Sequence, residues 1–145
     1  MSTQFYQFSK PINRLHFIGI GGIGVSALAR LARAASGRPA TAASTANLFA
    51  ENIKISGSDI AESELINELK NEDVDIKIGH RSDNVPNEAD LVVYTTAISE
   101  DNPEFLEARR RNIPTMSRPE FLGFISQNYQ TIAVAGTHGK PQLQA

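Results

Sequence analysis

The sequence lacks cysteine, carries little net charge and contains no long apolar run. Without cysteine, disulfide bonds and thiolate metal sites are excluded. A formal net charge of −2 over 145 residues gives no support for a nucleic-acid-binding surface. No apolar stretch approaches the roughly 20 residues that a membrane-spanning helix needs. Residues 1–13 lack the apolar middle of a signal peptide. We therefore expect a cytoplasmic protein without nucleic-acid or membrane partners.

Short β-branched or apolar runs alternate with helix-like stretches along the chain. This alternation predicts βαβ units and a Rossmann-like α/β fold, doubly wound, with a mostly parallel sheet and helices on both faces. The predicted strands are Leu15–Ile20, Ile53–Gly57, Asp75–Ile78, Leu91–Thr95, Pro114–Met116 and Thr131–Ala135. The predicted helices are Ile23–Ala35, Glu62–Asn71, Pro103–Arg111 and Pro119–Gln127. Because such sheets bind ligands beyond the carboxyl ends of their strands, functional residues are expected just after each strand.

One connection between a predicted helix and a predicted strand is unusually long, and one predicted helix has a clear capping signal. The stretch from Ser36 to Asn47 is longer than the roughly 2–6 residues usual between a helix and a strand. Its alanine, serine and threonine content predicts a surface insertion at about residues 36–50, with extra helical turns in Ala42–Glu51 as the alternative. Asp101 or Asn102 is the expected cap of the helix that Pro103 opens.

The first chemical motif is the loop Gly19-Ile20-Gly21-Gly22-Ile23-Gly24, which follows a predicted strand and opens a predicted helix. Gly19 and Gly21 permit a tight turn and close backbone approach to a diphosphate, and Gly24 is expected to let the helix pack closely on the sheet. The helix N-terminus offers free N–H groups to the anion. This context favours a diphosphate site over a glycine-rich turn without a ligand.

Polar residues follow the next three strands. An acidic residue about 20 positions beyond such glycines binds ribose hydroxyls, and Asp59 follows Gly24 by 35, an excess that the insertion accounts for. Ser58 or Asp59 can instead cap the next helix. His80 and the turn Thr96–Ser99 would face the same crevice, the alternatives being a solvated histidine and a polar turn. His16, inside an apolar strand, is expected to be structural.

A second loop, Gly136-Thr137-His138-Gly139-Lys140, follows the last predicted strand and resembles a short P-loop. In such a loop the backbone amides and the lysine hold phosphates, and a following serine or threonine holds Mg²⁺. Here Pro141 follows the lysine and brings neither a hydroxyl nor an N–H group. We expect no metal site in this chain and no ATP hydrolysis by the chain alone.

Together these motifs resemble the Mur ligase family, most closely its members that add L-alanine to UDP-N-acetylmuramate. The resemblance rests on residues 16–24, 56–59, 79–80, 96–103 and 135–140, in the family's order, and covers about residues 14–140 apart from the insertion. It implies a cytoplasmic step of peptidoglycan synthesis. L-alanine is joined to the lactyl carboxylate through an acyl phosphate, with ATP and Mg²⁺ as cofactors.

For this chain the resemblance implies a UDP-sugar-binding domain at residues 14–130, between a leader at 1–13 and the truncated start of an ATP-binding domain at 131–145. The implied UDP-sugar-binding residues are Gly19, Gly21, Gly22, Ile23, Gly24, Ser58, Asp59, His80, Thr96, Ala97, Ile98 and Ser99. The implied ATP-binding residues are Gly136, Thr137, His138, Gly139 and Lys140. Because the family continues through two further domains, we expect no complete catalytic set here.

Three other interpretations stay open at this point. One is a sister ligase that attaches a ready-made peptide to the same nucleotide. The second is an NAD(P)-binding domain of an oxidoreductase, since fold alone does not determine function. The third is a non-catalytic nucleotide-binding module.

Overall fold

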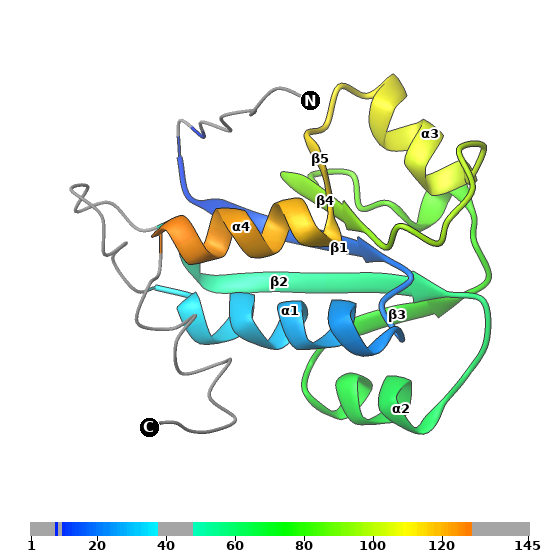
Figure 1. The fold of residues 1–145 in the computed structure, drawn as a ribbon, viewed down its shortest axis with the longest axis horizontal. Helices are drawn as coiled ribbons and strands as arrows, with labels where there is room; N and C mark the ends of the chain where they lie inside the picture. Colours follow the sequence, from blue (N-terminus) through cyan, green and yellow to red (C-terminus); the bar gives the residue numbers. More distant parts are fainter. Residues whose placement is uncertain (1–7, 9, 38–47, 129–145) are drawn as a thin grey trace.

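The computed structural model describes residues 8, 10–37 and 48–128, and these form an α/β domain around one parallel sheet (Figure 1). The strands are β1 (Ile12–Ile18), β2 (Phe49–Asp59), β3 (Asp75–Ile78), β4 (Leu91–Tyr94) and β5 (Thr115–Ser117). The helices are α1 (Ile23–Ala35), α2 (Glu64–Asn71), α3 (Pro103–Arg110) and α4 (Arg118–Asn128), with a short 3₁₀ helix, η1, at Ser82–Asn84.

The order of the strands across the sheet is β3-β2-β1-β4-β5, and every neighbouring pair is parallel. The chain therefore builds outward from β1 in one direction as far as β3, and then returns to the other side of β1 to add β4 and β5. This reversal places a topological switch point between β1 and β4, where the following loops diverge and leave a crevice. The predicted doubly wound fold is confirmed.

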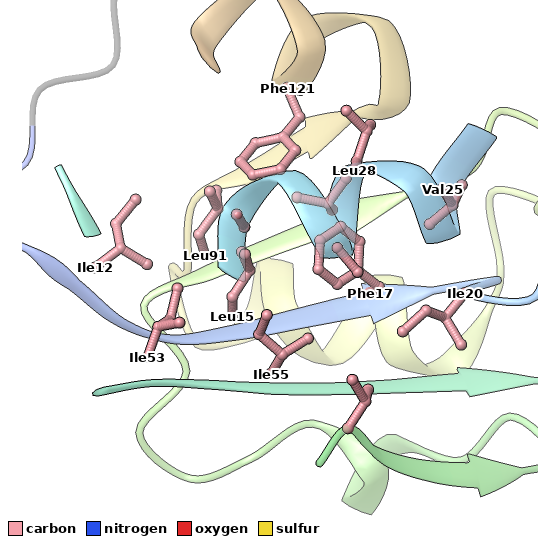
Figure 2. Packing of buried hydrophobic residues seen from close by; sticks show 14 of the residues in the cluster. Ile12, Leu15, Phe17, Ile20, Val25, Leu28, Ile53, Ile55, Leu91 and Phe121 are labelled. Carbon is pink, nitrogen blue, oxygen red and sulfur yellow. The ribbon is translucent and has the colours of Figure 1, made fainter. Parts of the chain in front are cut away.

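One face of the sheet carries the larger apolar core. Alternate residues of β1, including Leu15 and Phe17, point toward α1 and α4, as Figure 2 shows. The ring of Phe121 in α4 lies 5.9 Å from that of Phe17 and 6.2 Å from that of Phe49, both in edge-on contact. Ile66 of α2 belongs to the same cluster. The period-two alternation of apolar side chains thus directs one face of β1 and β2 to these helices.

The opposite face carries a smaller core and α3. Ile18 of β1 and Val92 of β4 pack there with Ala108 of α3, and Tyr94 makes an edge-on ring contact with Phe105 at 5.0 Å. The helices therefore cover both faces, as predicted. Among the described residues, no helix is long and apolar enough to cross a membrane.

Most predicted elements that the structure describes agree with it to within two residues at each end, but β1 begins three residues and β2 four residues earlier than predicted. β1 begins at Ile12, inside the stretch expected as a leader, and Ile12 is buried. β2 begins at Phe49, whereas the insertion was predicted to extend to about residue 50. Residues 49–51 therefore belong to this strand and not to the alternative helix. The reason is tertiary, since Phe49 pairs with Ile12 and buries its ring against α4. Residues 38–47 and the predicted strand Thr131–Ala135 lie outside the described part.

Candidate functional site

A cleft of about 700 Å³ opens at the carboxyl ends of the strands, at the switch point between β1 and β4. Loops that follow four different strands contribute to it. Its lining consists of Gly19, Gly21, Gly22, Asp59, Ile60, Ala61, Glu62, Ser63, His80, Thr95, Ala97, Ile98, Ser99 and Asn102. Most of the residues predicted to bind the UDP-sugar therefore come together. Ile23, Gly24, Ser58 and Thr96 are not part of the lining.

The glycine loop after β1 is held tightly against the ends of β2 and β4. The N–H groups of Gly19 and Ile20 both donate to the carbonyl of Ser58, each at 2.9 Å. Gly19 has a φ of +82°, and a Cβ placed there would lie 2.5 Å from Cγ2 of Thr95. Only glycine fits both the left-handed backbone and this close approach. The first glycine thus sets the turn that leads into α1.

The N-terminus of α1 presents unused hydrogen-bond donors. Gly22 is the N-cap residue and has no side chain to cap the helix. Within the described part of the chain, the N–H groups of Ile23, Gly24 and Val25 have no hydrogen-bond partner. Free N–H groups and the positive end of the helix dipole attract anions, so this end of the cleft suits a phosphate.

The structure gives a different reason from the predicted one for a glycine at position 24. A Cβ placed on Gly24 would lie 2.8 Å from Cδ of Arg118, the first residue of α4, and no sheet atom is among its nearest neighbours. The prediction that Gly24 lets α1 pack on the sheet was wrong, because the close neighbour is a side chain from the adjacent helix. Ile23 is 85% exposed.

Asp59 ties the end of β2 to the glycine loop. Its Oδ2 accepts a hydrogen bond of 2.7 Å from the N–H of Gly21, and its Oδ1 accepts one of 2.7 Å from the N–H of Ile60. The alternative role as the cap of α2 was wrong, because the hydroxyl of Ser63 caps that helix by accepting from the N–H of Ile66. A carboxylate has about four lone-pair sites, so Asp59 keeps acceptor capacity toward the cleft.

The turn after β4 is closed by short polar contacts. The N–H of Ala97 donates to Oγ1 of Thr95 at 3.4 Å, and the hydroxyl of Ser99 donates to Asp101 at 2.6 Å. Asn102 caps α3 by accepting from the N–H groups of Glu104 and Phe105, so one of the two predicted caps is confirmed. The capping places Glu104 in the first turn of α3.

Behind the cleft lies a buried polar cluster built around Glu104, a residue that the sequence analysis missed. Its side chain is fully buried and meets His16 of β1 at 2.7 Å and the hydroxyl of Ser58 of β2 at 2.8 Å. On its other oxygen it meets His80 at 3.1 Å and the amide of Asn84 at 2.9 Å. Ser58 is therefore placed behind His80, away from the cleft lining, and its predicted ligand contact remains a prediction.

The charge of Glu104 is stabilised by these contacts. Burial raises the pKa of Glu104, but hydrogen bonds from His16, Asn84 and Ser58 outweigh burial and hold the pKa at about 2. The carboxylate is therefore ionised at neutral pH. His16 is buried and bonded at both ring nitrogens, with Ser56 on Nδ1, which agrees with the predicted structural role.

The second predicted site lies elsewhere in the chain. The loop Gly136–Lys140 is outside the described residues. In the part of the chain that the structure describes, no group of three or more histidine, aspartate or glutamate side chains is placed to hold a metal ion.

A parallel doubly wound sheet with a glycine loop opening α1 and a polar cleft at the switch point is the architecture on which many nucleotide-binding α/β domains are built. The chain belongs to the Mur ligase family, because the family model described as "Mur ligase family, catalytic domain" matches residues 42–130. This match begins after the glycine loop, which is covered by the alignments to individual relatives.

These relatives include UDP-N-acetylmuramate–L-alanine ligases. The one from Clostridium tetani is 43% identical over 136 residues, which are 93% of this chain and 26% of the relative. The one from Carboxydothermus hydrogenoformans is 44% identical over 139 residues, which are 96% of this chain and 26% of the relative. The chain thus spans about a quarter of the length of the curated relatives it matches.

Solved structures show the same fold. The UDP-N-acetylmuramate–alanine ligase of Thermotoga maritima aligns with a TM-score of 0.63 and 30% identity, over 79% of this chain and 23% of that chain. A murein peptide ligase of Psychrobacter arcticus aligns with a TM-score of 0.61 and 23% identity, over 77% of this chain and 20% of that chain. At that lower identity the second likeness concerns the fold alone.

Proposed function

We propose that this chain is the UDP-N-acetylmuramate-binding domain of a ligase that adds L-alanine to that sugar nucleotide in peptidoglycan synthesis. The observation that carries the proposal is the position of the α1 N-terminus. Its three free N–H groups open beside a cleft that Asp59 and His80 also line. The names of the relatives, at 43–44% identity across nearly the whole chain, supply the substrate class.

The cleft divides by chemistry into two parts. The diphosphate would bind at the glycine loop and the first turn of α1, where donors and the helix dipole favour negative charge. The nucleoside would lie toward Asp59, whose unused lone pairs accept hydrogen bonds from ribose hydroxyls. The turn of residues 96–99 would close the opposite side of the same cleft.

In the full-length enzyme the chemical step would need ATP, which would activate the carboxylate for amide-bond formation, and Mg²⁺, which would neutralise charge on the phosphates. The residues proposed for that role are Gly136–Lys140, within residues 131–145, which we propose are the truncated start of an ATP-binding domain. Pro141 stands where a Mg²⁺-binding hydroxyl is usual. We therefore propose that the 145-residue chain binds the sugar nucleotide without completing ligation. L-alanine would be a partner only of the full-length enzyme, and a cytoplasmic location remains a prediction.

The proposal is tested by isothermal titration calorimetry of the purified chain with UDP-N-acetylmuramate, with NADH and NADPH titrated in parallel. Saturable binding of the UDP-sugar alone is expected. Binding of NADH or NADPH alone would favour the oxidoreductase interpretation, and no binding of any of the three would refute a working nucleotide site. UDP and UDP-N-acetylglucosamine, titrated as controls, separate recognition of the nucleotide from recognition of the lactyl group.

A further inference from the structure

The buried carboxylate of Glu104 accepts five hydrogen bonds from the described residues. Its Oε1 accepts from His16 and Ser58, and its Oε2 accepts from the His80 ring, the Asn84 amide and the N–H of Arg81. Among the described residues, no lysine or arginine side chain forms an ion pair with it. A buried charge held by this many donors orders all of them at once.

The two groups that face Nδ1 of His80 determine whether this nitrogen carries a hydrogen. The Ser58 hydroxyl uses its single hydrogen on Oε1 of Glu104, at 2.8 Å, so toward the His80 ring it can only accept. The ionised Oε2 of Glu104 is also only an acceptor. Nδ1 of His80 lies 3.2 Å from the hydroxyl and 3.1 Å from that oxygen, so it must carry the hydrogen.

The other ring nitrogen of His80 is then free for a ligand. In the neutral ring, the state that this inference requires, the single N–H lies on Nδ1, so Nε2 keeps a lone pair and acts as an acceptor. Nε2 has no hydrogen-bond partner in the described ranges, and the His80 side chain lines the cleft with 21% of its surface exposed. In His16 the hydrogen lies on the other nitrogen, Nε2, because this nitrogen faces Glu104 and must donate.

We propose that Glu104 is a positioning residue, which holds His80 as the Nδ1–H tautomer so that Nε2 accepts a hydrogen bond from the nucleoside part of the ligand. The inference rests on the proposed function. Phosphate oxygens offer no hydrogen to a lone pair, whereas a uracil imide N–H or a ribose hydroxyl does. Glu104 thus acts on the ligand through His80 without touching it.

The first test needs no substitution of Glu104. Two-bond proton–nitrogen correlation NMR of the chain labelled with ¹⁵N on histidine reports the tautomer of each ring, and the His80→Ala spectrum assigns the His80 signals. His80 should carry its hydrogen on Nδ1 and His16 on Nε2. A hydrogen on Nε2 of His80 would overturn the inference, whatever the variants below do.

The second test is a double-mutant cycle read by calorimetric affinity for UDP-N-acetylmuramate. Glu104→Met removes both acceptor oxygens at similar volume and should weaken binding about tenfold, the typical worth of one well-formed hydrogen bond to a ligand. In the His80→Ala background the same change should have almost no further effect. Glu104→Gln keeps one oxygen for the three donors on the His80 side but turns an NH₂ donor toward His16 and Ser58, so it should restore only part of the affinity.

The control is Glu107→Met, the same change on the same helix, at a carboxylate that pairs with Arg110 and Arg111 away from the cleft. It should leave affinity unchanged. An equal loss from Glu104→Met with and without His80 would overturn the inference and leave the proposed function standing, because Glu104 would then act through the loop. No binding by the unsubstituted chain would overturn both. Circular dichroism confirms that each variant is folded.

Discussion

Gly19 offers a direct test of the geometry that forms the cleft. Replacing it with alanine places a Cβ 2.5 Å from Cγ2 of Thr95 on a backbone with φ of +82°. The left-handed backbone costs about 1–2 kcal/mol for a residue with a Cβ, and moving Thr95 off its preferred rotamer costs about 0.5–1.5 kcal/mol. The lower entropy of the unfolded alanine chain offsets about 0.4–1 kcal/mol. Gly19→Ala should therefore lower the free energy of unfolding by about 2 kcal/mol.

Gly79 is the matched control. It also has a positive φ, +93°, but nothing lies within 4 Å of a Cβ placed there. Gly79→Ala shares the backbone cost and the entropy offset, so the difference between the two variants isolates the contact with Thr95. That difference should be about 1 kcal/mol, from the rotamer cost alone.

Thr95→Ser provides the rescue. Serine keeps the oxygen that accepts from the N–H of Ala97 and removes the methyl group that a Cβ on residue 19 would meet. In the Thr95→Ser background, Gly19→Ala should cost no more than Gly79→Ala. Urea unfolding followed by circular dichroism measures each free energy. Equal losses for Gly19→Ala and Gly79→Ala, or no rescue by Thr95→Ser, would refute the argument.

Three further predictions concern the ligand, the buried charge and the core. Gly22→Val should abolish calorimetric binding of UDP-N-acetylmuramate and should lower the free energy of unfolding by only about 1 kcal/mol, since a Cβ on Gly22 has no neighbour nearer than 3.6 Å and valine is a poor N-cap residue; retained affinity in the folded variant would contradict the diphosphate assignment. Because folding lowers the pKa of Glu104 from 4.5 to about 2, its stabilisation is present above pH 4.5 and is lost as the pH falls toward 2. Glu104→Gln should remove up to about 3 kcal/mol of that pH dependence in urea unfolding at different pH, and an unchanged acid branch would argue against an ionised Glu104. Phe121→Ala should lower the free energy of unfolding by about 3–5 kcal/mol, because its buried ring contacts Phe17 and Phe49, and a loss below about 1 kcal/mol would contradict that packing.

Elements with a strong local pattern were predictable from the sequence. Ile23–Ala35 and Asp75–Ile78 have the predicted bounds, because their apolar spacing and flanking residues identify a helix and a strand without reference to the rest of the chain. The start of β2 was not predictable in the same way. Phe49 follows an alanine- and serine-rich stretch, and it joins the strand because it pairs with Ile12 and packs on α4.

The residues of the candidate site likewise include some that could be predicted from the sequence and one that could not. The glycine loop, Asp59 and His80 could be chosen because each directly follows a strand, and parallel strands end at one edge of the sheet. Glu104 could not, because an acidic residue in the first turn of a helix usually faces solvent and the helix dipole. An otherwise apolar strand interrupted by His16 was the one available sign that a buried partner exists.

By itself, the sequence determined the order of helices and strands, the glycine loop that opens α1, and the resemblance that led to the family. These features depend on residues close together in the chain, where periodicity and glycine placement act directly. Only the tertiary structure decided that Glu104 would meet His16, 88 residues earlier, and hold His80 and Ser58 in one buried cluster. Local patterns report which face of an element is buried, whereas the partners across that face are set by the order of strands in the sheet.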